Sequence, residues 1–211
     1  CTGYAFLIDE LAYHAGIDVR VINGYGRLSG ANVGGEGIMN HSWNAVRLDG
    51  QWYLCDPTWA SGYIDGREKK FVPNYDDVYF LTDPELFILQ HYPKDSYWTL
   101  LESPPALDEF LNGPVVYRSG VRKHVIPVFP GKLKHTKQPG EGMKIHFKSE
   151  QVENVTVVCS RHRKGALISS SLNRGKNGYS LTTWISKKGV HDIHIVFDDK
   201  PVMSYQIRIK E

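Results

Sequence analysis

The sequence predicts two parts, an α+β core followed by an antiparallel β-sandwich. Three observations predict this: apolar residues at helical spacing near the start, two strand-like runs around an Asp-Gly pair, and many short alternating runs after the Pro-Pro pair at residues 104–105. The net charge also reverses, with 7 Lys and Arg against 14 Asp and Glu in residues 1–105, and 18 against 9 in residues 106–211. We therefore expect two domains, residues 1–103 and 104–211.

The first expected element is an amphipathic helix close to the start of the chain. Gly16 is well placed to end this helix, because glycine adopts the left-handed conformation that helix ends often need. Cys1 then stands at the beginning of the helix, where unpaired N–H groups acidify a thiol. The apolar positions at helical spacing are Tyr4, Leu7, Ile8, Leu11, Ala12 and Ala15.

The pair Asp49-Gly50 predicts a hairpin between the strand-like runs 41–48 and 51–57. A two-residue turn makes the numbers of facing residues add up to 99, so Arg47 faces Trp52. Before the hairpin, residues 19–28 are expected to form a strand interrupted by glycines, followed by a glycine-rich loop.

The hairpin register decides which side chains can meet. Side chains alternate between the two faces of a strand, so His41, Trp43 and Asp56 share one face and Cys55 points to the other. His41 and Asp56 become diagonal neighbours with Cβ atoms roughly 7–8 Å apart. An imidazole and a carboxylate can form a hydrogen bond across that gap.

Cysteine-dependent nucleophilic catalysis requires such a pair next to a thiol. The carboxylate of Asp56 would hold the His41 ring in one tautomer, and His41 would take the proton from Cys1. Trp43 beside the pair would limit the access of water. Residues 83–93 are expected to form a short helix that starts at an Asp cap and stops before a proline.

Several stretches together resemble the transglutaminase-like superfamily of papain-type cysteine enzymes. The similarity is greatest to the branch that contains the kyphoscoliosis peptidase and its bacterial relatives, and it covers nearly all of residues 1–101. The stretches that carry it are CTGYAFLIDELAYHAGI, VRVINGYG, HSWNAVRLDGQWYLCDPTWASG and YFLTDPELFILQHYPKDSYWTLL.

The resemblance implies a papain-like, transglutaminase-like core with Cys1 as nucleophile, His41 as general base and acid, and Asp56 as the residue that orients His41. It implies acyl transfer from a protein or peptide amide through a thioester, with hydrolysis favoured over cross-linking and no cofactor. We further expect Trp59 and Tyr63, together with Trp43, to line a substrate groove.

One departure from the superfamily concerns the start of the chain. In the superfamily, further helices and an oxyanion-stabilising residue precede the nucleophile, whereas here the sequence opens on Cys1. We therefore expect the core to be N-terminally incomplete, as part of a longer protein.

The sequence leaves three alternatives to this catalytic interpretation open. Cys1 could be an N-terminal nucleophile whose own amine acts as base. Enzymes of that kind open with a strand, however, and this interpretation gives His41 and Asp56 no role. Cys1 could be lipid-modified, although a flexible tether normally follows such a residue. The chain could also be a non-catalytic binding or scaffold protein that retains the fold.

Composition narrows the remaining classes. The chain contains no apolar run long enough for a membrane span. Three cysteines are too few and too scattered for a disulfide framework or a zinc site, and we expect no metal, His191 and His194 included. The basic second half suggests contact with an acidic polymer or surface, while no nucleic-acid motif is present. The compartment is left open, with an exported or cell-surface bacterial protein as one expectation.

Overall fold

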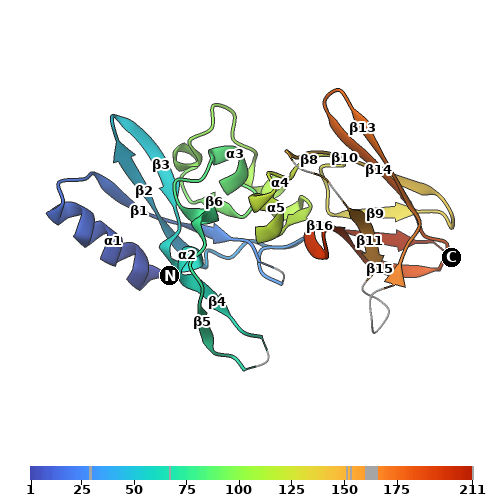
Figure 1. Cartoon of the computed structure of the whole chain (residues 1–211), viewed down its shortest axis with the longest axis horizontal. Coiled ribbons are helices and arrows are strands. Elements are labelled where there is room, and N and C mark those ends of the chain that lie inside the picture. The colour runs from blue at the N-terminus through green and yellow to red at the C-terminus, as the bar shows by residue number, and fades with distance from the viewer. Residues whose placement is uncertain (29, 67, 151, 153, 160–165, 211) are drawn as a thin grey trace. The chain divides into compact units, whose positions relative to one another are not determined.

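The structure is a computed structural model, and it divides the chain into two compact units (Figure 1). Unit 1 contains Cys1–Arg27 and Gly37–Pro105, and unit 2 contains Leu28–Glu36 and Ala106–Glu211. The residues that the structure describes are 1–28, 30–66, 68–150, 152, 154–159 and 166–210.

Unit 1 is an α+β unit built on a four-stranded antiparallel sheet with the order β3-β2-β1-β6. Helix α1 packs against β1, β2 and the short helix α2 (Figure 1). The elements are α1 (Thr2–His14), β1 (Val19–Gly26), β2 (His41–Leu48), β3 (Gln51–Cys55), α2 (Pro57–Ser61), β4 (Gly62–Ile64), β5 (Phe71–Pro73), the 3-10 helix η1 (Asp77–Tyr79), α3 (Pro84–Phe87), β6 (His91–Pro93) and the 3-10 helix η2 (Ser96–Thr99).

The expected first helix is present as α1, with Cys1 as its N-cap residue. Gly16 follows the helix with a φ of 70°, the left-handed conformation that the sequence predicts there. The apolar stripe of α1, however, is only partly covered by other residues. Ala5 and Ala12 are buried, whereas Leu7 and Leu11 remain more than half exposed.

The hairpin between β2 and β3 has the predicted register. Arg47 pairs with Trp52, and Leu48 pairs with Gln51. Asp49 and Gly50 both have positive φ angles, 48° and 80°. This is the backbone of a type I′ turn, whose twist matches that of the two strands.

The prediction of a helix over residues 83–93 is confirmed for the first part of this range and is wrong for the last part. Asp83 caps α3 by accepting a hydrogen bond from the backbone N–H of Glu85, as predicted. The helix ends at Phe87, and His91–Pro93 instead form strand β6, which pairs with β1. Pairing at this sheet edge satisfies backbone groups of β1 that a longer helix would have left open.

Unit 2 is rich in β-strands, as the alternating runs predict. One sheet has the order β13-β14-β10-β8, and the other has the order β12-β11-β15-β16-β7 with β9 paired to β16 in parallel. Phe147 of β10 lies against Phe197 of β15, with ring centroids 5.7 Å apart, so the two sheets are in contact through their apolar side chains. The elements are α4 (Leu107–Asn112), β7 (Val115–Val116), α5 (Arg118–Arg122), β8 (Ile126–Phe129), β9 (Lys134–Lys137), β10 (Gly142–Lys148), β11 (Val155–Cys159), β12 (Ala166–Leu167), β13 (Ser170–Gly175), β14 (Gly178–Trp184), β15 (Gly189–Phe197) and β16 (Lys200–Ile209).

Part of the glycine-rich loop belongs to unit 2. The backbone N–H of Gly34 donates to the Leu111 carbonyl, and Lys134 Nζ donates to the Gly34 carbonyl, each at 2.8–2.9 Å.

None of the helices in the described part of the chain has the length and apolarity that a membrane crossing requires.

Candidate active site

The hairpin brings His41 and Asp56 into direct contact. His41 is the first residue of β2, and Asp56 directly follows β3. The distance from His41 Nε2 to Asp56 Oδ2 is 2.6 Å, which is short even for a charge-assisted hydrogen bond. The His41 side chain is 7% exposed and the Asp56 side chain is 0% exposed. The diagonal contact that the register predicts is therefore present.

Asp56 has a second task as the N-cap residue of α2. Its Oδ1 atom accepts hydrogen bonds from the backbone N–H groups of Thr58 and Trp59, at 2.9 and 3.0 Å. These bonds satisfy two N–H groups that a helix start leaves open. They also fix the carboxylate, so that Oδ2 faces His41.

A second histidine, which the sequence reading missed, shares the same carboxylate. His91 Nε2 lies 2.9 Å from Asp56 Oδ2, and the His91 side chain is 0% exposed. The missed signal is the early end of α3. A single helix over residues 83–93 leaves no strand that could pair with β1, whereas β6 places His91 opposite Gly26.

The electrostatics of this cluster follow from burial and hydrogen bonding. Burial opposes the ionisation of Asp56, but the hydrogen bonds from His41 and His91 outweigh it and hold the Asp56 pKa well below its usual range. An ionised carboxylate can only accept, so we assign a proton to Nε2 of both histidines. This tautomer leaves His41 Nδ1 with a free lone pair that can take a proton.

Burial also keeps His91 neutral, because it lowers the pKa of the ring more than the nearby Asp56 raises it. The Phe87 carbonyl favours the protonated ring, but among the described residues no group forms a hydrogen bond of good geometry with His91 Nδ1. A proton on Nδ1 would therefore be a buried donor without a well-aligned acceptor.

Cys1 is the residue at the start of α1, and it approaches the chain just before His41. Its Sγ atom is 4.0 Å from the carbonyl oxygen of Asn40, the residue directly before His41. The helix is tied to the hairpin by Asn44, whose Nδ2 donates to the Ala5 carbonyl at 2.9 Å. Asn44 is on the face of β2 opposite to His41, and there it holds the helix that carries Cys1.

Two glycines of β1 make room for the site. A Cβ atom at Gly26 would lie 2.8 Å from His41 Cβ, and one at Gly24 would lie 2.6 Å from the Trp43 ring. Neither approach is compatible with a larger side chain. The glycines that seemed to interrupt the strand are therefore the positions where His41 and Trp43 pack on its backbone.

The three residues expected to line a substrate groove have different positions. Trp43 is fully buried, with its ring centroid 5.1 Å from that of His91 and 5.9 Å from that of Phe87. Trp43 therefore belongs to the core beneath the His41–Asp56 pair and does not line the groove that the sequence predicts. Trp59 stacks on the His41 ring at 4.9 Å and is half-buried, and Tyr63 of β4 is 47% exposed.

The other two cysteines are separate from the candidate site. Burial, with a smaller contribution from Asp56, raises the pKa of Cys55 to about 12, so this thiol stays protonated at neutral pH. Cys159 is buried in unit 2, and its Sγ is 3.5 Å from Nδ1 of His191. Cys1 is the exposed thiol of the three.

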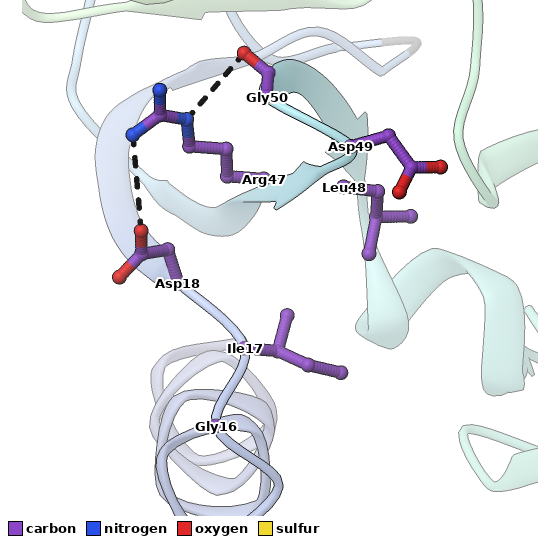
Figure 2. A pocket seen from close by; sticks show the side chains of 7 residues that line it. All are labelled: Gly16, Ile17, Asp18, Arg47, Leu48, Asp49 and Gly50. Carbon is purple, nitrogen blue, oxygen red and sulfur yellow. Dashed lines mark hydrogen bonds and ion pairs between the residues drawn. The ribbon is translucent and has the colours of Figure 1, made fainter.

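Two further features bear on where a ligand could bind. Among the described residues, His41, Asp56 and His91 are the group whose donor atoms lie close enough to hold a metal ion, but hydrogen bonds already occupy these atoms. A cavity of about 500 Å³ lies between the end of α1 and the β2–β3 turn, where Arg47 bridges to Asp18 (Figure 2). It is at the far end of β2 from His41, and no candidate residue lines it.

Comparison with known families matches the segment that contains the three candidate residues. Residues 1–57, which contain all three of Cys1, His41 and Asp56, match a family model described as the transglutaminase-like superfamily. Residues 1–57 belong to this superfamily. The transglutaminase-like match ends directly after Asp56, so it covers the helix, the hairpin and the acid but not His91.

Curated relatives match over a larger part of the chain. The kyphoscoliosis peptidases of Mus musculus and Homo sapiens are each 41% identical over 114 residues, which is 53% of this chain and 17% of their own length. Hillarin of Drosophila melanogaster is 34% identical over 126 residues, 54% of this chain and 15% of its own length. The chain thus spans less than a fifth of these relatives.

Among solved structures, the chain is similar to the Lin-41 filamin domain. That match has a TM-score of 0.31 and 14% identity, and it covers 46% of this chain and 99% of the filamin domain.

Proposed function

We propose that the chain carries out cysteine-dependent acyl transfer on protein or peptide amides through a thioester, with hydrolysis as the outcome. The observation that supports this most is the 2.6 Å bond between His41 Nε2 and Asp56 Oδ2, together with a thiol at the start of α1 that approaches the residue before His41. The membership of residues 1–57 in the transglutaminase-like superfamily and the name peptidase in two relatives agree with it.

The proposed reaction has two steps, formation of the thioester and its hydrolysis, and Cys1, His41 and Asp56 act in both. His41 Nδ1 takes the proton of Cys1, and the thiolate attacks the amide carbonyl carbon. The carbon–nitrogen bond breaks as His41 gives its proton to the leaving amine, and a thioester on Cys1 remains. Water then attacks the thioester with His41 as base, and the thiol regains its proton as the acid product leaves. Asp56 holds the ring and stabilises its charged form.

The half-buried Trp59 and the exposed Tyr63 are the proposed contacts for substrate. Trp59 covers one face of the His41 ring, and Tyr63 follows it on the β4–β5 ribbon. We further propose that the two sheets of unit 2 form an Ig-like β-sandwich that positions partners. Its excess of Lys and Arg would favour an acidic polymer or surface.

A binding or scaffold protein is the second candidate. The observation that favours it is the position of the thiol. Among the described residues, the hydrogen bonds of Cys1 Sγ go to Thr2 Oγ1 and the Asn40 carbonyl, both at 4.0 Å, and not to His41. Catalytic hydrogen bonds are often long before substrate binds, so this geometry leaves the first candidate in place.

The experiment that tests the proposal measures turnover of a peptide library with the wild-type chain and the Cys1→Ala variant. The products are analysed by mass spectrometry for cleaved peptides, deamidated glutamine and incorporated amine. We expect products and a covalent acyl adduct on Cys1 in the wild type, and neither in Cys1→Ala. Equal product formation by both proteins would end the proposal, and the absence of product from both would favour the scaffold.

A further inference from the structure

The Asp56 carboxylate is shared by two histidines, and only one of them has a role in the proposed reaction. Within the described part of the chain, four donors reach the carboxylate: Thr58 N and Trp59 N bind Oδ1, while His41 Nε2 and His91 Nε2 bind Oδ2. His91 comes from β6, a separate strand that the reaction scheme does not use.

The position of His91 is defined by aromatic packing on several sides. Its ring stacks on Phe87 with centroids 4.0 Å apart, and it lies 4.3 Å from the Trp59 ring and 5.1 Å from the Trp43 ring. The side chain has no exposed surface. His91 therefore cannot touch a substrate, and among the described residues its hydrogen bond of good geometry is the one with Asp56.

We propose that His91 is a positioning residue for the His41–Asp56 pair, because its Nε2–H group occupies the second lone pair of Oδ2 and so fixes the carboxylate toward His41. This inference rests on the proposed function for its consequence in turnover. The same geometry has a second, independent consequence for the ionisation of Asp56.

Two physical effects follow from this donor. First, a carboxylate held at Oδ1 by two amides and at Oδ2 by two imidazoles cannot rotate away from His41, so the ring keeps one orientation. Second, a neutral donor stabilises the carboxylate anion in a buried place where burial alone would favour the acid. The hydrogen bond from His91 is one of the causes that hold the Asp56 pKa low.

The surroundings of His91 contain few other groups that could produce the same pH behaviour. The titratable groups that face it are His41 from β2, Asp56 at the start of α2 and Tyr79 from η1, whose ring centroid is 6.0 Å away. The Tyr79 hydroxyl donates to Gln90 Oε1 and not to Asp56. Phe87 of α3, packed on the ring face, is apolar.

The test separates a hydrogen-bonding role from a packing role by pairing two kinds of substitution in the full chain. His91→Gln keeps an N–H donor near the place of Nε2 but fills the apolar pocket poorly. His91→Phe keeps an aromatic ring but has no donor, and His91→Leu serves as the second apolar variant if the larger ring prevents folding. Tyr79→Phe, which removes a neighbouring buried hydroxyl, is the matched control.

Two readouts are measured for each variant: the acid limb of the pH dependence of turnover, and the carboxyl titration of Asp56 by ¹³C NMR. We expect His91→Phe or His91→Leu to lose about ten- to a hundredfold in turnover, by analogy with the loss when hydrogen-bond partners of metal-binding histidines are removed. We also expect the acid limb and the Asp56 titration to move to higher pH by about one unit or more. His91→Gln should stay within about threefold, and Tyr79→Phe should leave the titration of Asp56 in place.

The opposite ranking would overturn the inference. If His91 were only a packing residue, His91→Phe would be at least as active as His91→Gln, and neither would move the Asp56 titration. The NMR readout does not depend on turnover. A wild type without thiol-dependent turnover would therefore refute the proposed function, while a shifted Asp56 titration in the apolar variants would still support the role of His91.

Discussion

Replacing Asp56 with Asn should destabilise unit 1 strongly, because this carboxylate is the centre of a buried network. The Asn oxygen can still accept from the N–H groups of Thr58 and Trp59, so the helix cap survives. The Asn amide, however, would direct its N–H₂ group at two ring nitrogens that also carry protons. His41 can change tautomer to accept, but the same change in His91 would put a proton on its buried Nδ1, which has no well-aligned partner among the described residues.

The size of the effect follows from these bonds. A hydrogen bond to a charged group contributes about 1.5–3 kcal/mol, and Asp56→Asn removes two such bonds, those from His41 and His91. We therefore expect Asp56→Asn to lower the free energy of unfolding of unit 1 by about 3–5 kcal/mol at pH 7. Asp83→Asn is the matched control, because Asp83 caps α3 at the surface through a single bond to the Glu85 N–H, and it should cost less than about 0.5 kcal/mol.

The assay is urea unfolding followed by tryptophan fluorescence, which reports mainly on unit 1. Four of the five tryptophans lie there, and Trp184 is in unit 2. Because the Asp56 pKa is lowered in the folded state, its contribution is complete above the unfolded value of about 3.9 and is lost as the pH falls through the folded value. The deficit of Asp56→Asn should therefore be constant from pH 8 to 5 and shrink below about pH 4. A loss no larger than that of Asp83→Asn would refute the account of the network.

Three further predictions follow from the same region. Gly26→Ala should lower turnover by about a hundredfold, because the new Cβ would lie 2.8 Å from His41 Cβ and displace the ring; Gly3→Ala, which meets no atom within 4 Å, is its control and should keep wild-type turnover. Asn44→Ala should lower the free energy of unfolding by about 1–3 kcal/mol in urea, because the bond to the Ala5 carbonyl is lost; an unchanged urea midpoint would show that Asn44 does not anchor α1. Burial lowers the pKa of His91, so the unfolded chain binds a proton below about pH 6.5 that the folded chain does not; stability should fall with decreasing pH by up to about 1.4 kcal/mol per unit, and this component should be absent from His91→Gln.

The hairpin shows what local sequence can predict about this site. Asp49-Gly50 dictates a two-residue turn, the turn dictates the register, and the register places His41 and Asp56 diagonally on one face. Each step is local, and the predicted contact is present at 2.6 Å. The start of α1 at Cys1 follows in the same way from helical periodicity and from Gly16.

His91 shows what local sequence cannot predict. Its place depends on pairing between β6 and β1, which brings His91 opposite Gly26 from far along the chain. The apolar run after Asp83 fits a helix and a short buried strand equally well, and periodicity does not separate these. Trp43 is a related case, because its face was predicted correctly, but its complete burial results from Phe87 and His91 packing over it.

The reactivity of Cys1 tests the central claim most directly. The measurement is the rate of iodoacetamide alkylation of each cysteine at pH 6, by peptide mapping, in the wild type, His41→Ala and Asp56→Asn. We predict that Cys1 reacts at least about tenfold faster than a free peptide thiol, that Cys55 and Cys159 stay unmodified, and that both variants slow Cys1. A Cys1 that reacts no faster than a peptide thiol, or at the same rate in all three proteins, would contradict a functional triad of sulfur, imidazole and carboxylate.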